Sequence, residues 1–188
     1  AESIAMGNSS GRNRQGEHCI ALGHGSGRFD QEEFSIAIGT FSAERDQNVR
    51  SIAIGSGAGQ TNQGGTDIAD GRAVAIGLVA GHNLQQTDTV AIGGFTGHKS
   101  QNISSIAIGV AAGQTNQGGT DAADGRAVAI GHVAGSDQQK TDSVAIGGFT
   151  GHKLQNISSI AIGVAAGQTN QGGTDAADGR AVAIGHVA

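Results

Sequence analysis

The chain of 188 residues contains no proline, tryptophan or tyrosine and only five phenylalanines, so it lacks the side chains that fill a large globular core. It has one cysteine, Cys19, which excludes an intrachain disulfide framework. We expect this thiol to be a small buried residue in a strand. No apolar run approaches the roughly 18 residues of a membrane span, so insertion of this segment into a membrane is not expected.

The chain also lacks a cluster of charges of the same sign. The 16 acidic and 11 basic residues are scattered along the chain and leave a net charge of -5. This distribution gives no electrostatic footprint for nucleic acid, and such a partner is not expected. Glycine is abundant, with 34 residues, but it does not recur at every third position and there is no proline, which excludes collagen. The regular apolar positions described below exclude a disordered chain.

The sequence is a repeat. Each unit ends in a motif of the type Ser-Ile-Ala-Ile-Gly, and we call its last residue the closing glycine. Seven of the spacings between closing glycines are 16 residues and three are 22. Residues 77–130 and 131–184 form a 54-residue super-repeat and differ at only seven positions. Fixed periods of this kind are typical of solenoids. The closing glycines are Gly7, Gly23, Gly39, Gly55, Gly77, Gly93, Gly109, Gly131, Gly147, Gly163 and Gly185.

Within each unit the apolar residues alternate with small ones. Ile36 and Ile38 point to one side, whereas Ser35 and Ala37 point to the other, which predicts a strand. A second glycine usually follows four residues after the closing glycine and predicts a tight turn.

Sixteen residues at about 3.3 Å each allow one strand out and a second strand back, whereas three six-residue faces need about 18 residues. We therefore predict an all-β fold: a parallel β-solenoid in the form of a two-sided β-roll, and not a triangular β-helix. It has about 11 coils in a single domain over residues 1–188, within a longer repetitive fibre. The six extra residues of each long coil, around Asp67, Asp121 and Asp175, are expected to form exterior loops at one edge.

A glutamine stands eight residues after the closing glycine in all ten complete units. In a parallel stack this position recurs in every coil, so the amides are predicted to form a hydrogen-bonded ladder along the axis, inside the roll or at its edge. The predicted ladder consists of Gln15, Gln31, Gln47, Gln63, Gln85, Gln101, Gln117, Gln139, Gln155 and Gln171.

The alanine of the strand motif does not vary, and the residue two before it is always small. Such an uncharged strand face predicts a packed surface. Either the Ile and Val side chains fill the roll and the alanines meet a neighbouring chain, or the reverse holds. In both cases the second face needs a cover, so we predict a homo-oligomer. The packed face consists of Ala5, Ala21, Ala37, Ala53, Ala75, Ala91, Ala107, Ala129, Ala145, Ala161 and Ala183.

The motif at residues 35–39, Ser-Ile-Ala-Ile-Gly, and its ten relatives resemble the head repeats of trimeric autotransporter adhesins. A small residue often follows three places after the closing glycine. The phrase Ala-Gly-Gln-Thr-Asn-Gln-Gly at 58–64, 112–118 and 166–172 is also similar to fibre repeats of large DNA viruses and phages. The resemblance covers essentially the whole chain. It implies a left-handed roll, three copies around a long axis and exposure on a cell or particle surface.

The sequence contains only weak signals of metal binding, and we expect no catalytic residue, cofactor or metal site. His82 and His98 share a position in adjacent units, but the histidines as a set lack a metal-ligand spacing and are expected to be solvated. The insert carboxylates could hold Ca²⁺, yet two per loop are too few, and a polar turn is favoured. These pairs are Asp67 with Asp70, Asp121 with Asp124 and Asp175 with Asp178.

Asn-x-Ser sequons occur at Asn8, Asn102 and Asn156, and both glycosylation and chance explain them. Because repeats run to both ends of the sequence, we also expect axial contact with more of the same chain or with another copy, as in an end-to-end filament.

The leading functional prediction is a non-catalytic structural fibre, stalk or filament segment on a cell or virus surface. An adhesin or host-recognition fibre that binds an unidentified surface receptor is the alternative, for which Phe95 and Phe149 are a hint. An ice-binding solenoid is a distant third, since it needs a Thr-x-Thr array that is absent. Repeated units provide no constellation of acid, base and nucleophile, so an enzyme is not expected.

Overall fold

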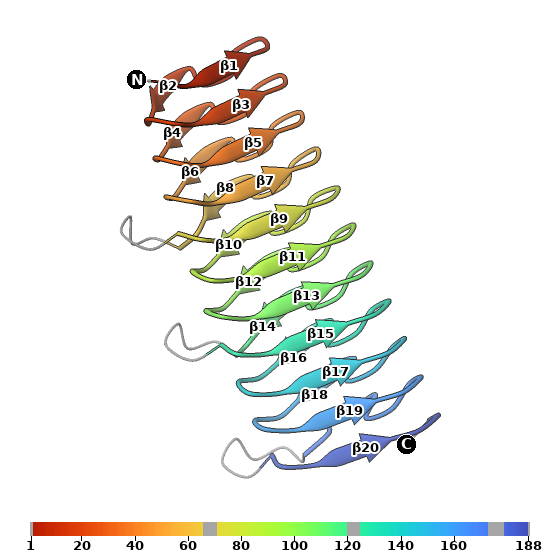
Figure 1. The fold of residues 1–188 in the computed structure, drawn as a ribbon. Helices are drawn as coiled ribbons and strands as arrows, with labels where there is room; N and C mark the ends of the chain where they lie inside the picture. The colour runs from red at the N-terminus through yellow and green to blue at the C-terminus, as the bar shows by residue number, and fades with distance from the viewer. Residues whose placement is uncertain (1, 66–70, 120–124, 173–178, 188) are drawn as a thin grey trace.

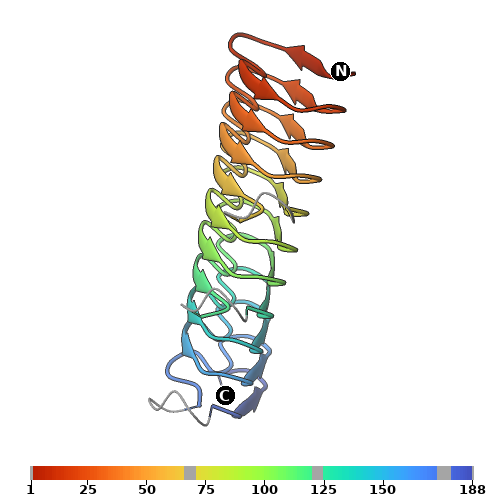
Figure 2. The same cartoon turned by 90° about the vertical axis from the view of Figure 1, so that its left-hand side faces the viewer.

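The computed structural model describes residues 2–65, 71–119, 125–172 and 179–187. It is a parallel β-solenoid with two sheets, and the described residues contain no helix. Figure 1 shows the coils stacked along one rod with the termini at opposite ends. In Figure 2, after a quarter turn, the two sheets run down opposite sides of the rod. The two-sided all-β roll predicted from the 16-residue period is therefore confirmed.

The first sheet, which we call sheet A, has 11 strands formed by the repeated motifs. Identical positions pair in register, as in Ala5 with Ala21 and Ile36 with Ile52. Its strands are β1 (Ile4–Met6), β3 (Ile20–Leu22), β5 (Ile36–Ile38), β7 (Ile52–Ile54), β9 (Val74–Ile76), β11 (Val90–Ile92), β13 (Ile106–Ile108), β15 (Val128–Ile130), β17 (Val144–Ile146), β19 (Ile160–Ile162) and β20 (Val182–Ile184).

The second sheet, sheet B, has nine strands and contains nine of the ten predicted glutamines, all but Gln171. A single bridge between Lys153 and Thr169 extends it by one more coil. Nine successive coils thus contribute one strand to each sheet. The strands of sheet B are β2 (Asn13–Gln15), β4 (Phe29–Gln31), β6 (Arg45–Gln47), β8 (Thr61–Gln63), β10 (Asn83–Gln85), β12 (Lys99–Gln101), β14 (Thr115–Gln117), β16 (Asp137–Gln139) and β18 (Lys153–Gln155).

The alanines of sheet A point into the roll. The nine from Ala21 to Ala161 have no exposed surface, whereas Ala5 is exposed and Ala183 is half-buried in the terminal coils. Of the two arrangements that the sequence left open, the one with Ile and Val outside is therefore observed. These alanines are buried inside their own chain, so lateral contact between chains cannot run through them.

The glutamines lie inside the roll and join the two sheets. Those from Gln31 to Gln155 are at most 1 % exposed, Gln171 is 7 % exposed and Gln15 is half-buried. Each Nε2 donates to the backbone carbonyl 11 residues earlier, in sheet A, over 2.6–3.1 Å. Eight of them also donate to the carbonyl just before the next strand of sheet A.

The amide-to-amide ladder is only partly formed. Among the described residues, an amide donates to its counterpart in the next coil in three pairs: Gln15 to Gln31, Gln47 to Gln63 and Gln85 to Gln101, over 3.1–3.4 Å. The strand carbonyls are the main acceptors because they lie directly across the narrow interior. The predicted amides are thus inside the roll, but they bond across it more than along it.

Glycine is required where backbones or amides approach closely. A Cβ at Gly27, whose φ is +51°, would lie 2.6 Å from Oε1 of Gln31. The closing glycines stack on one another, and a Cβ at Gly23 would lie 2.7 Å from the carbonyl oxygen of Gly39 in the next coil. Cys19 is buried among backbone carbonyls and Ser35, as expected, but it lies directly before β3 and not within a strand.

The expected exterior loops and the Ca²⁺ candidates fall outside the described residues. This applies to Asp67, Asp70, Asp121, Asp124, Asp175 and Asp178. The adjoining residues are described: Asn48 Nδ2 donates to the carbonyls of Gly64 and Gly65 over 3.1 and 2.9 Å, and thereby fixes the start of the first insert.

Two adjacent glutamines test the role of the interior amides. Gln139 donates to the carbonyls of Val128 and Ser143, whereas its neighbour Gln138 is exposed on the outer face. We expect Gln139→Ala to lower the free energy of unfolding by about 1–3 kcal/mol, because both hydrogen bonds are lost in a buried site. Gln138→Ala, the control, should change it by less than about 0.5 kcal/mol. Denaturant unfolding measures both, and equal effects would contradict the crosslinking role.

Two adjacent glycines test the stacking of the closing glycines. A Cβ at Gly93, with φ of +129°, would lie 2.8 Å from Oγ1 of Thr96 and closer still to the carbonyl of Gly109. A Cβ at Gly94 would meet nothing within 4 Å. We expect Gly93→Ala to destabilise the fold by at least about 1–3 kcal/mol. Gly94→Ala should be neutral, or stabilising by up to about 1 kcal/mol. Thermal unfolding of the two variants distinguishes the positions, and the reverse order would refute this account.

Candidate functional site

The outer surface of sheet A is the largest candidate site. Each strand directs its first and third residues outward, so 11 strands present 22 aliphatic side chains and no charge. We call this surface the aliphatic face. It consists of Ile4, Met6, Ile20, Leu22, Ile36, Ile38, Ile52, Ile54, Val74, Ile76, Val90, Ile92, Ile106, Ile108, Val128, Ile130, Val144, Ile146, Ile160, Ile162, Val182 and Ile184.

These side chains are partly covered by their neighbours in the same columns but remain accessible. Ile108, Ile130, Ile146 and Ile162 are 36–37 % exposed. A soluble single chain normally directs charged or long polar residues from such a sheet face into water. The largest apolar patch on a typical monomer is about 300–600 Å². The 22 side chains of this face, eight of them 36–67 % exposed and the others partly exposed, present on the order of 1,000 Å². The aliphatic face is therefore a larger apolar surface than a typical monomer exposes.

The outer surface of sheet B is polar. Its middle strand residues adopt left-handed backbone angles in all ten coils, with φ between 51° and 56°. Half of these positions are Asp or Asn, the side chains that tolerate this region best after glycine. The positions are Arg14, Asp30, Asp46, Asn62, Leu84, Ser100, Asn116, Gln138, Leu154 and Asn170.

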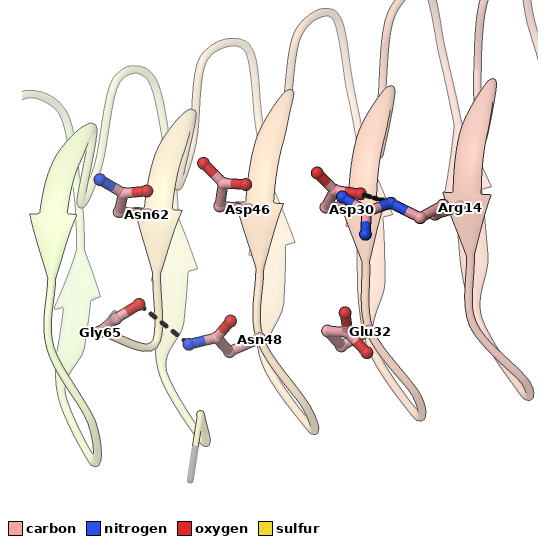
Figure 3. Close-up of a pocket in the computed structure, with 7 residues that line it drawn as sticks. All are labelled: Arg14, Asp30, Glu32, Asp46, Asn48, Asn62 and Gly65. Atoms are coloured by element: carbon pink, nitrogen blue, oxygen red, sulfur yellow. Dashed lines mark hydrogen bonds and ion pairs between the residues drawn. The ribbon is translucent and has the colours of Figure 1, made fainter. Parts of the chain in front are cut away.

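A polar groove crosses the first four coils of sheet B. Figure 3 shows its lining residues in two rows along the axis, with Arg14 paired to Asp30 and Asn48 bonded to Gly65. Three carboxylates and one guanidinium give the groove a formal charge of -2. The lining consists of Arg14, Asp30, Glu32, Asp46, Asn48, Asn62 and Gly65. The part of the chain that the structure describes holds no cluster of three or more His, Cys, Asp or Glu suited to a metal.

The turns between the sheets carry most of the histidines and phenylalanines. His24 meets Phe41 and His132 meets Phe149 edge to face, with ring centroids 4.9 and 5.1 Å apart. His82 and His98 lie together in adjacent coils, with centroids 5.1 Å apart. The sequence placed these two histidines in one column but did not predict their contact as a feature of interest.

Phe95 and Phe149, the aromatic hint of a binding edge, are 43 % and 42 % exposed on turns that lie one super-repeat apart. Each packs near the histidine three residues later, with centroids 6.2 and 6.3 Å apart. They are separated by intervening coils and do not form one aromatic cluster.

The sequon asparagines differ in accessibility. Asn102 and Asn156 are only 6 % and 3 % exposed, and their Nδ2 atoms donate to glycine carbonyls in the next coil. A glycan on either amide nitrogen is incompatible with these contacts. Asn8 is exposed. No helix long and apolar enough to cross a membrane occurs among the described residues.

Arg–Asp pairs recur at the edge where the long coils return to sheet A. Arg72 donates to Asp88 through Nε and Nη2 over 2.6 and 2.9 Å, and Arg126 to Asp142 over 2.7 and 3.0 Å. Both pairs are exposed and therefore contribute little to stability. The hydrogen bonds from arginine lower the pKa of Asp88 and of Asp142.

The pKa of Asp88 in the folded chain is below its unfolded value. The contribution of this pair to stability is therefore present above the unfolded pKa and is lost as the pH falls through the folded pKa. We expect Arg72→Met to raise the pKa of Asp88 toward its ordinary value and to leave the pKa of Asp142 unchanged. Carboxyl titration by NMR measures both. An unchanged pKa of Asp88 in the variant would show that the arginine is not the cause.

The chain matches no family model, and it matches no curated protein and no solved structure. The parallel β-solenoid and the surfaces that its columns create are therefore the basis for any functional conclusion.

Proposed function

We propose that the chain is a non-catalytic structural segment of a fibre, stalk or filament, and that copies of it associate laterally through the aliphatic face. The observation that carries this proposal is the uninterrupted double row of Ile, Val, Leu and Met along sheet A. Contact between two such faces removes on the order of 2,000 Å² from water, which exceeds the roughly 1,600 Å² of a standard stable interface.

A rod with one apolar and one polar long face suits a parallel bundle of chains. The aliphatic faces meet at the bundle axis, and the polar surface of sheet B remains in water. The resemblance to trimeric autotransporter head repeats favours three copies, a left-handed roll and a place outside the cell or on a virion surface. The column of identical residues also allows a bundle to extend along its axis without any change in its lateral contacts.

Recognition of a surface receptor is the second candidate function. The polar groove of Figure 3 supports it, because the groove lies on the sheet opposite to the aliphatic face and stays accessible in a bundle. An ice-binding surface is not supported by the strand register, since Thr61 pairs with Arg45 on one side and Asn83 on the other. The threonines therefore form no continuous row.

Charge substitutions on the aliphatic face test the lateral interface. We expect the native chain to sediment as an oligomer and the double variant Ile108→Glu with Ile146→Glu to sediment as a folded monomer, because the charges enter a dry interface. Leu84→Glu is the control: Leu84 is 38 % exposed on the polar sheet B, and this variant should remain oligomeric. Analytical ultracentrifugation gives the masses and circular dichroism reports the fold.

A charge at the interior position next to Ile108 is expected to affect folding and not assembly. Ala107 has no exposed surface, so Ala107→Glu should unfold the chain instead of dissociating it, since a buried unpaired charge costs more than the fold can offset. A native chain that is monomeric at high concentration, with unchanged behaviour of the double variant, would refute lateral assembly through the aliphatic face.

A further inference from the structure

His82 and His98 differ from the other aromatic contacts of the turns. They stand at the same position of successive coils, their ring centroids are 5.1 Å apart and their planes are inclined by 30°. The other ring contacts of histidine between neighbouring coils in the described ranges pair histidine with phenylalanine. His82 and His98 thus bring two imidazoles together, whereas each of the other contacts joins one imidazole to one phenyl ring.

The backbone holds the two rings at a fixed spacing. The carbonyl of His82 accepts from the amide of Thr61 over 3.0 Å, and the carbonyl of His98 accepts from the amide of Asn83 over 3.1 Å. Both residues therefore belong to the ladder of sheet B, where coils repeat at about 4.8 Å. The stacking of the coils therefore fixes the spacing of the two rings, which does not depend on the approach of two independent loops.

Partial burial favours the neutral form of both imidazoles. Partial burial lowers the pKa of His82 and of His98, and repulsion from His82 and from Lys99 lowers the pKa of His98 further. Neutral imidazole is the form that binds metal ions through a ring nitrogen. Both rings are half-buried, and Nδ1 of His82 is buried without a hydrogen-bond partner.

We propose that His82 and His98 together bind one divalent transition-metal ion, such as Zn²⁺, Ni²⁺ or Cu²⁺, between their ring nitrogens. Imidazole suits these three ions, whereas Ca²⁺ and Mg²⁺ need oxygen ligands that are not clustered here. No third His, Cys, Asp or Glu joins the pair among the described residues. The remaining coordination positions belong to water or to a ligand from outside, so the site is open.

The residues at the equivalent position of adjacent coils indicate a conservative substitution for His82 and His98. The equivalent positions one coil before His82 and one coil after His98 are Gln60 and Gln114, so glutamine fits this turn without a change of fold. His82→Gln and His98→Gln remove one imidazole each. His132→Gln and His24→Gln are matched controls, because these histidines contact phenylalanine. Cys19→Ser tests the only thiol and places a residue that is native to its column.

The experiment is a calorimetric titration of the metal-free chain with ZnCl₂, NiCl₂ and CuCl₂ in a buffer that does not coordinate metals. We expect one equivalent to bind the native chain, and a weakening of at least about tenfold in His82→Gln and in His98→Gln. His132→Gln, His24→Gln and Cys19→Ser should bind as the native chain does. The bound metal should also raise the melting temperature of the native chain and not that of the two site variants.

Three results would overturn the proposal. These are no binding by the native chain at millimolar metal, binding that survives both His82→Gln and His98→Gln, and binding that is lost in Cys19→Ser or in the control histidine variants. Circular dichroism of every variant establishes that a loss of binding is not a loss of fold. Neither the titration nor its outcome depends on lateral assembly, so the two proposals stand or fall separately.

Discussion

The glutamine amide that joins the two sheets determines the architecture of this solenoid. Its Nε2 bonds to a carbonyl of sheet A in each of the ten coils, so the distance between the sheets equals the reach of one glutamine side chain. A glutamine that fills the interior leaves room across from it only for alanine and for a glycine at the turn, as the contact of Gln31 with Gly27 shows. The interior is consequently narrow and rich in polar groups, and the hydrogen bonds that the amide Nε2 atoms donate hold it together.

The narrow interior explains why the largest apolar side chains lie outside. Ile and Val are the strand residues with most to gain from burial, about 1.5–3 kcal/mol each when fully removed from water, yet the roll has no space for them. The chain thus carries an apolar surface that its own fold does not cover. The lateral association that we propose would cover this surface, because the apolar area that is missing from the core is present on the aliphatic face.

Much of this fold was accessible from the sequence, because a column of identical residues reveals the period, the strands and the in-register pairing. The sequence did not show which face of each strand points into the roll. Ile36 and Ala37 alternate in the same way whichever side is inward, and only the position of Gln47 across the interior decides between them. The groove and the His82–His98 contact also needed coordinates, since a shared column predicts proximity but not the orientation of two rings.

The backbone of each coil could not persist alone. The described residues include 29 non-glycine positions with positive φ, among them the β-branched Val79 and Val133 at turn tips. A left-handed conformation costs an L-residue about 1–2 kcal/mol, and no contact within a single coil offsets several such positions. Between coils, however, every turn is bonded to the next: Val79 donates to Ser56, and Val133 to Val110. The strain is therefore tolerated only in a stack, so stability arises between neighbouring coils and a defect such as Gly93→Ala weakens the contacts on both of its sides.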